Sequence, residues 1–292
     1  MTFPFYLDLF GLRLHPHLVF EGLGYFLGAR LYFALRRRAR EAPLPLETNL
    51  WVLVGCVFGA WLGSKLLAWA ESPAHYLAAI QADPSALLGG KTIVGGLLGG
   101  WAGVEIAKKC CGVTRSTGDL FVYPLALGTA VGRIGCFLTG LSDRTYGLAT
   151  ALPWGVDFGD HVRRHPTQLY ESLFVLVWAL VLRLATRGGM GILPMLSGAG
   201  PQAHGRDPAF AGGSVGQAAR ATAALPPGAL FRLYLAGYLI FRFFVEFIKP
   251  REPLLGSLSA IQLASLAGTV FCLFTLRRLV WPIGNRNSKS QN

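Results

Sequence analysis

The chain of 292 residues is 52% hydrophobic and only 14% charged, and its mean hydropathy of +0.45 excludes an ordinary soluble domain of this size. Its formal net charge is +12, but the basic residues flank apolar segments, which favours orientation in a membrane over nucleic-acid binding. The five cysteines have no C-x-x-C spacing and predict neither a disulfide framework nor a zinc site.

Long apolar segments follow one another along the whole chain. A transmembrane helix needs about 20 predominantly apolar residues. Seven segments fit, namely 18–36, 51–71, 92–108, 119–138, 169–186, 228–248 and 258–281. Several are rich in glycine, which suits close approach of helices in lipid. The sequence therefore predicts an all-α polytopic membrane protein of about seven transmembrane helices, with residues 1–292 forming a single integral membrane domain.

The distribution of basic residues predicts the orientation of these helices. With the N-terminus outside, most of the 27 lysine and arginine residues fall in the inner loops. The positive-inside rule therefore favours an outer N-terminus and a cytoplasmic C-terminus.

Two connections are longer than the others. Residues 139–168 interleave charged, aromatic and glycine residues, and the rings of Tyr146 and Trp154 favour an ordered outer loop. Residues 188–227 are rich in Gly, Ala and Pro without periodicity, which predicts a flexible cytoplasmic low-complexity insertion.

Arg133, Arg242 and Glu246 lie inside two of the most apolar stretches of the chain. Each costs about 2.5–3.5 kcal/mol at the centre of a membrane helix and usually faces a cavity or another charge. Arg242 and Glu246 are four residues apart and can form an intrahelical ion pair. Arg133 has no carboxylate three or four residues away, so its partner is a lipid phosphate, or alternatively Glu246 or a backbone carbonyl.

The predicted topology brings further polar residues to the outer half of the membrane. Besides the three buried charges, this end receives His15, His17, Glu21, Lys65, Glu71, Lys91, Gly95, Gly96, Asp143, Arg163, Arg164, His165, Tyr170 and Glu171. His165 is interpreted either as a catalytic group or as a hydrogen-bonded structural residue. Pro166 and Glu171 suit a helix N-terminus, and His15 and His17 are interpreted as interface residues.

Four runs, GRIGCFLTG, PWGV, RHPTQLYE and YLIFRFFVEFIKPRE, resemble in order and spacing the motifs of the bacterial prolipoprotein diacylglyceryl transferases. The resemblance implies a multi-pass protein of the bacterial cytoplasmic (inner) membrane. It implies transfer of a diacylglyceryl group from phosphatidylglycerol to the lipobox cysteine thiol of prolipoproteins, releasing glycerol 1-phosphate. The expected partners are therefore phosphatidylglycerol, the lipobox of the signal peptide and membrane lipids, with no nucleic acid, metal or soluble cofactor.

The resemblance and the buried charges nominate the same residues. The expected catalytic residues are Arg133, Arg242, Glu246 and His165. The expected substrate-binding residues are Arg133, Lys91, Gly95, Gly96, Asp143, Tyr146, Gly147, Gln168, Tyr170, Glu171 and Tyr238. The arginines would hold the lipid phosphate, and His165 or Lys91 would assist deprotonation of the acceptor thiol.

The chain also departs from the family pattern. Cys136, Thr139 and Leu141 stand where the pattern has two asparagines and a glutamate, and Val94 stands where it has a histidine. Asp143 lies close enough to replace the missing carboxylate. Two alternatives therefore stay open: a paralogue that uses the same lipid with a different acceptor, and a non-enzymatic lipid-binding or transport protein.

Overall fold

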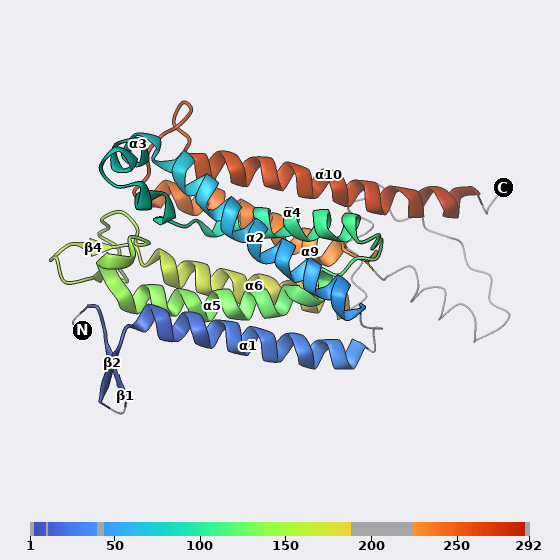
Figure 1. The fold of residues 1–292 in the computed structure, drawn as a ribbon, viewed down its shortest axis with the longest axis horizontal. Coiled ribbons are helices and arrows are strands. Elements are labelled where there is room, and N and C mark those ends of the chain that lie inside the picture. Colours follow the sequence, from blue (N-terminus) through green and yellow to red (C-terminus); the bar gives the residue numbers. More distant parts are fainter. Residues whose placement is uncertain (1–2, 10, 40–43, 188–224, 290–292) are drawn as a thin grey trace.

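The computed structural model describes residues 3–9, 11–39, 44–187 and 225–289 as a bundle of long helices (Figure 1). Most of the predicted insertion 188–227, namely 188–224, lies outside the described residues.

Every predicted apolar segment is helical. The long helices are α1 (Pro16–Ala39), α2 (Leu46–Glu71), α4 (Ile93–Cys110), α5 (Val122–Thr139), α6 (Thr167–Arg187), α9 (Ala229–Val245) and α10 (Ala260–Lys289). The short ones are α3 (Pro73–Ala82), η1 (Pro84–Leu88), η2 (Asp119–Phe121), η3 (Gly140–Asp143) and η4 (Glu246–Ile248). Five stretches of the described chain, at α1, α2, α5 with its flanking turns, α6 and α10, are long and apolar enough to cross a membrane. This pattern confirms an all-α membrane protein.

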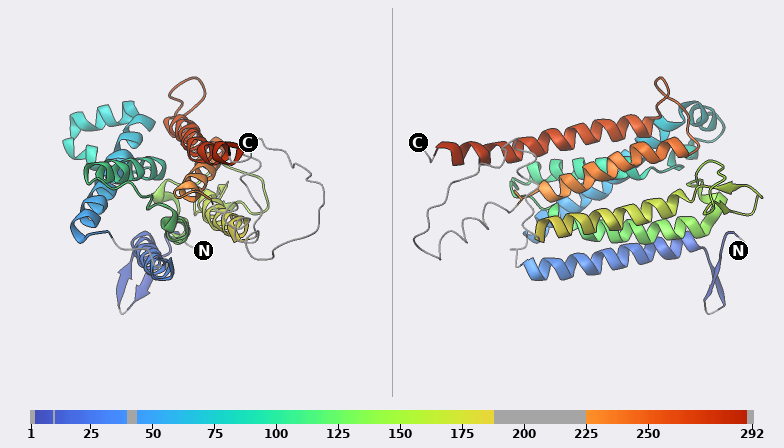
Figure 2. Two further views of the ribbon diagram at one scale, coloured as in Figure 1. Left: turned by 90° about the vertical axis from the view of Figure 1, so that its right-hand side faces the viewer. Right: turned by 180° about the vertical axis from the view of Figure 1, so that it is seen from behind.

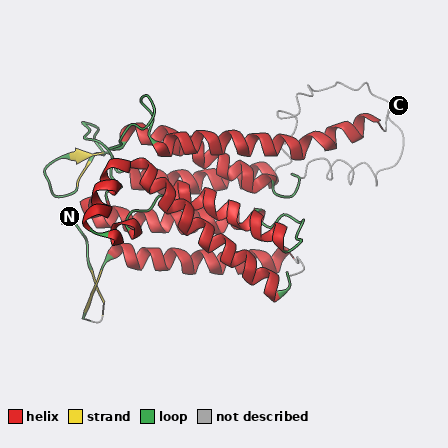
Figure 3. Ribbon diagram, turned by 45° about the horizontal axis from the view of Figure 1, so that its top comes forward, coloured by secondary structure: helices red, strands yellow, loops and turns green. Residues whose placement is uncertain are grey.

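Two short hairpins are added to the helices. The first pairs β1 (Leu7–Leu9) with β2 (Leu12–Leu14), and the second pairs β3 (Val156–Asp157) with β4 (Arg163–Arg164), both antiparallel. Figure 3 shows that these strands lie at one end of the bundle. The same end carries α3 and the connection between α5 and α6 (Figure 1), and we call it the hairpin end.

Glycines bring α2 and α4 into backbone contact. The facing sets are Gly55, Gly59 and Gly63 on α2 and Gly95, Gly99 and Gly103 on α4. A Cβ atom at Gly59 would lie 2.3 Å from the carbonyl oxygen of Gly99, and one at Gly99 would lie 2.2 Å from that of Gly59. Only glycine fits at such a distance, which confirms the expectation of close helix approach.

Side chains cap the two helices that complete the bundle. The carboxylate of Asp119 accepts hydrogen bonds from the backbone N–H groups of Gly228 at 2.5 Å and Phe231 at 2.9 Å, and so caps α9 from η2. Ser259 and Gln262 form a reciprocal capping box at the start of α10, with each side chain accepting from the other's N–H group. These caps satisfy backbone donors that a helix start leaves unpaired.

The helices pack as neighbours that are often distant in sequence. Helix α1 lies against α5, α5 against α6, and α9 against α10. Figure 2 shows α6, α9 and α10 running along the bundle in its right-hand view. As a result, α5, α6 and α9 enclose a common interior that holds the buried charges.

The glycine contact is tested by a pair of matched substitutions on α4. We expect Gly99→Ala to lower the free energy of unfolding by about 1–3 kcal/mol, because its Cβ would overlap the Gly59 carbonyl. Gly96→Ala is the control, since the nearest atom to its Cβ is 3.7 Å away. Thermal unfolding in detergent, followed by circular dichroism, measures both. Equal melting temperatures would contradict the packing argument.

Candidate active site

A buried carboxylate, Glu171, joins two arginines from different helices. Its Oε2 atom accepts from Arg133 Nη2 at 2.9 Å and from Arg242 Nη1 at 3.1 Å. Arg133 lies on α5, Glu171 on α6 and Arg242 on α9, and none of the three is more than 9% exposed. The partner of Arg133 is thus Glu171, which the sequence analysis had assigned to substrate binding and helix capping.

Two further residues of α9 and η4 complete this network. Glu246 accepts from Arg242 Nη2 at 2.8 Å, so the predicted intrahelical ion pair is present. The hydroxyl of Tyr238 donates to Glu171 Oε1 at 2.6 Å. Two guanidiniums and two carboxylates balance in charge, which offsets the cost of burial. We call Arg133, Glu171, Tyr238, Arg242 and Glu246 the arginine network.

The arginine network retains unused hydrogen-bond donors. The Nε atoms of Arg133 and Arg242 are buried and have no partner among the described residues. Gln168 lies one helical turn before Glu171, and its side-chain amide is buried and equally unpaired with any described residue. An unpaired buried polar group costs about 1–3 kcal/mol. Two unpaired guanidinium donors beside one carboxylate therefore favour an anion as ligand, and a phosphate matches the guanidinium geometry.

Lys249 places another cation beside the arginine network. It follows η4 directly and is half-buried. Burial, followed by the positive charge of Arg242, lowers the pKa of Lys249 to about 8. Lys249 is the lysine of the run YLIFRFFVEFIKPRE, and no separate role was predicted for it. A basic residue three positions after Glu246 was the signal that could have identified it.

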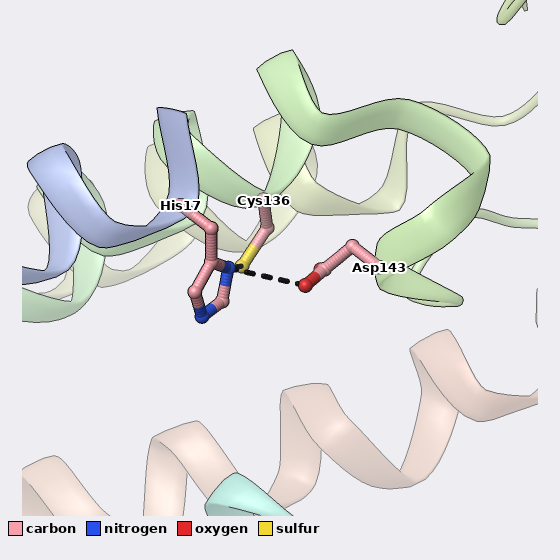
Figure 4. A group of neighbouring side chains, drawn as sticks. All are labelled: His17, Cys136 and Asp143. Carbon is pink, nitrogen blue, oxygen red and sulfur yellow. Dashed lines mark hydrogen bonds and ion pairs between the residues drawn. The ribbon is translucent and has the colours of Figure 1, made fainter. Parts of the chain in front are cut away.

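A second polar cluster lies where α1 meets the end of α5 (Figure 4). His17 Nδ1 lies 3.1 Å from Asp143 Oδ1 and 3.7 Å from Cys136 Sγ. On the other side of the ring, His17 Nε2 lies 3.3 Å from Glu21 Oε2 and 3.2 Å from Lys91 Nζ. The predicted residues Asp143 and Lys91 are thus brought together by His17, which the sequence analysis interpreted only as an interface residue.

The two clusters are adjacent on α5. Arg133 Nη1 lies 4.0 Å from Cys136 Sγ, one helical turn away. Cys136 therefore belongs to both clusters, although its sequence signal was only a departure from the family pattern.

His165 lies in the ordered connection after β4, apart from the arginine network. Its Nδ1 atom is 3.2 Å from the Tyr170 hydroxyl, which accepts from Trp154 Nε1 at 2.8 Å. In the described part of the chain it makes no hydrogen bond or ion pair to Arg133, Arg242 or Glu246. These contacts match the structural interpretation of His165, and its catalytic role remains a prediction.

The remaining predicted residues of this connection pack around a glycine. A Cβ atom at Gly147 would lie 2.9 Å from the carbonyl oxygens of both His165 and Ile248. This close approach ties the connection to η4, directly beside Glu246. The ring of Tyr146 lies under the guanidinium of Arg164 at 5.2 Å.

Gly95 and Gly96, predicted to bind substrate, occupy the first turn of α4. Gly95 packs on the Gly63 carbonyl of α2, where a Cβ would lie 2.2 Å away. Gly96 has ordinary contact distances. Their helix-packing role is evident from these distances, and substrate binding by them stays a prediction. Val94, beside them, is fully buried.

Comparison of the sequence with known proteins identifies a family. The model of the prolipoprotein diacylglyceryl transferases matches residues 4–195 and 215–278. The chain is similar to the phosphatidylglycerol–prolipoprotein diacylglyceryl transferase of Geobacter sulfurreducens, with 30% identity over 97% of this chain and 100% of the relative. The enzyme of that name from Synechococcus elongatus is 28% identical over 91% and 81%, and that from Nitrosomonas europaea is 34% identical over 54% and 60%.

Removal of the shared carboxylate tests the arginine network. We expect Glu171→Gln to lower the free energy of unfolding by about 3–5 kcal/mol, because two buried guanidiniums lose their common partner. Glu47→Gln, at an exposed position in the first turn of α2, is the control and should change stability little. Denaturant unfolding in detergent measures both, and a Glu171→Gln protein as stable as the control would refute the network's structural role.

The pKa of Lys249 generates a pH-dependent prediction. Its folded-state pKa of about 8 lies below the usual value of about 10.4 for an unfolded chain. Between these values the unfolded state binds more protons, so this residue makes stability rise with pH from about 8 to about 10. We expect Lys249→Met to remove this rise, while Lys109→Met, at an exposed position, keeps it. Melting temperatures between pH 7 and 10 are the measurement, and an unchanged pH profile for Lys249→Met would contradict the assignment.

Proposed function

Because the chain belongs to the prolipoprotein diacylglyceryl transferase family, we propose that it transfers the diacylglyceryl group of phosphatidylglycerol to the lipobox cysteine thiol of prolipoproteins. Glycerol 1-phosphate is the second product. The observation that carries this proposal is the pair of buried arginines whose Nε atoms have no partner among the described residues.

The arginine network has the properties needed to bind a phosphodiester. Arg133 and Arg242 approach Glu171 from two helices, so their guanidiniums are fixed at a common point. Bound phosphate would accept from the free Nε–H groups without displacing Glu171. Gln168 adds a neutral donor on the adjacent turn of α6.

The reaction then depends on charge stabilisation in a dry site. As the thiolate attacks the glyceryl carbon, negative charge grows on the phosphate oxygen that leaves. Fixed donors directed at such an atom stabilise the transition state. Glu246 and Tyr238 hold Arg242 and Glu171 in position, so they act as positioning residues in this scheme.

The site fits a location in the outer half of the bacterial inner membrane. With seven transmembrane helices and an outer N-terminus, the hairpin end faces outward. Arg36, Arg37 and Arg38 in the last turn of α1 and Lys108 and Lys109 in that of α4 then lie on the cytoplasmic side, which agrees with the positive-inside rule.

A different acceptor is the second candidate. Val94, where the family pattern has a histidine, is fully buried and offers no proton-transfer group. His17, Cys136 and Asp143 form an alternative polar cluster on the acceptor side. Complementation of cells depleted of their own transferase separates the candidates, because only lipobox transfer restores growth.

Loss of Arg133 is the direct test of the proposed reaction. We expect Arg133→Ala to lower transfer of labelled diacylglycerol from phosphatidylglycerol to a lipobox peptide by about 10²–10³-fold, the usual effect of losing one transition-state donor. The matched control is Arg183→Ala on α6, whose guanidinium instead packs over Tyr123 at 5.9 Å. Full activity of Arg133→Ala at normal membrane levels would refute the assignment.

A further inference from the structure

The cluster of His17, Cys136 and Asp143 has the composition of a metal site. The three residues come from α1, α5 and η3, and their side chains point toward one another (Figure 4). Their ligand atoms all lie within 4.8 Å of one another, and this is the one such group of three in the described part of the chain. Cys136 is buried, and the side chains of His17 and Asp143 are 22% and 12% exposed.

Hydrogen bonds and an ion pair connect these three side chains to one another. A neutral imidazole Nδ1 atom carries either one proton or one lone pair, yet both Asp143 and Cys136 approach the same Nδ1 atom. One proton on Nδ1 can thus be donated to Asp143, and the Cys136 thiol can donate to the same carboxylate. The three ligand atoms also have the grouping that a metal ion requires.

The distances between ligand atoms agree with tetrahedral zinc. Ligand bonds of about 2.0 Å to nitrogen and oxygen and about 2.3 Å to sulfur give N–O and N–S separations of about 3.3 and 3.5 Å. The observed separations are 3.1 Å for His17 and Asp143 and 3.7 Å for His17 and Cys136. The mixed nitrogen, oxygen and sulfur set suits zinc. The thiolate and the carboxylate together neutralise the charge of a divalent ion.

Outer contacts hold two of the three ligands in the orientation for metal binding. His17 Nε2 lies 3.3 Å from Glu21 Oε2, the carboxylate–histidine contact that usually supports a metal-bound imidazole. Thr145 Oγ1 donates to Asp143 Oδ2 at 2.6 Å and leaves Oδ1 for the ion. Lys91 Nζ, 3.6 Å from Glu21 Oε2, and Arg133 Nη1, 4.0 Å from Cys136 Sγ, are the cations beside the site.

We propose that His17, Cys136 and Asp143 bind one zinc ion and leave its fourth position open for the acceptor thiol. The open position distinguishes reactive zinc sites from closed structural ones, and a thiol that coordinates zinc is deprotonated outright. The second half of this proposal rests on the proposed transferase function. The zinc ion would supply the group that forms the acceptor thiolate, a role that the apolar side chain of Val94 cannot fill.

Atoms and charges balance in the proposed step, and the oxidation state of zinc does not change. The acceptor thiol loses its proton to solvent on coordination. Its sulfur then forms a bond to the glyceryl carbon, and the bond from that carbon to the phosphate oxygen breaks. The electron pair leaves with the phosphate, so a phosphodiester monoanion and a thiol give a thioether, a phosphate monoester dianion and a proton.

Metal content tests the site without reference to activity. Protein purified in detergent without chelator and titrated with Zn²⁺ should bind about one ion per chain, the stoichiometry of a single site with three protein ligands. Cys136→Ser and Asp143→Asn should lose this ion, whereas Cys110→Ser, at an exposed cysteine, should keep it. Glu21→Gln should weaken zinc affinity by about 10- to 100-fold. Wild-type protein that binds no zinc would overturn the proposal, even if a variant fails to fold.

Cobalt substitution tests the open position. Wild-type protein loaded with Co²⁺ should show a sulfur-to-cobalt absorption band, and a lipobox peptide should strengthen it by adding a second thiolate. The same peptide with serine in place of cysteine should not. Absence of any increase with the cysteine peptide would overturn the acceptor role.

The transfer assay separates failure of this proposal from failure of the proposed function. Full diacylglyceryl transfer by a zinc-free protein would refute the role of zinc in activating the acceptor thiol and leave the proposed function intact. Zinc binding without transfer to any lipobox peptide would support the site and refute the function. Loss of zinc and of transfer together in Asp143→Asn, with both retained in Cys110→Ser, is the result that we expect.

Discussion

The shared carboxylate of Glu171 is the contact on which the arrangement of the site depends. Two guanidiniums in an apolar bundle would repel one another and lose their hydration without a partner. Glu171 Oε2 binds both, at 2.9 Å to Arg133 and 3.1 Å to Arg242. Because these residues lie on α5, α6 and α9, one oxygen atom fixes the mutual positions of three helices and two cations. The Nε donors remain available for a ligand.

The rest of the fold serves to hold these three helices in place. Asp119 caps α9 from η2, which precedes α5, so the start of the helix that carries Arg242 is fixed to the element that carries Arg133. At the opposite end of α9, Gly147 lets the connection before α6 pack on the backbone of η4 beside Glu246. Local rules of capping and close glycine approach thus position a site made of long-range contacts.

The sequence was sufficient for those features that depend on composition along a single helix. Arg133, Arg242 and Glu246 could be identified because charges are costly at membrane depth, and the Arg242–Glu246 pair follows from helix periodicity. Seven helical segments followed from the length of apolar runs. Glu171 as the partner of Arg133 could not be predicted, because 38 residues and a change of helix separate them, and no periodicity relates residues on different helices.

The cluster of His17, Cys136 and Asp143 could not be predicted from the sequence for the same reason. The prediction that there is no zinc site came from cysteine spacing, which detects only ligands that are close in sequence. His17 and Cys136 are 119 positions apart and meet only because α1 packs on α5. Lys249 had a local signal, its place three residues after Glu246, but its interactions with Arg133 and Glu171 on other helices had none.

Helix α5 unites the two halves of the proposed reaction. Arg133 and Cys136 are three residues apart, so they lie on one face, and their side chains come within 4.0 Å. A phosphate held by Arg133 and a thiolate held near Cys136 would therefore meet within one helical turn. Displacement requires the attacking sulfur and the leaving oxygen to lie on opposite sides of one carbon atom, so the two groups must be close but held by separate ligands. The arginine network and the histidine–cysteine–aspartate cluster fit that requirement of the proposed reaction, because each has its own partners and the Arg133–Cys136 contact joins them.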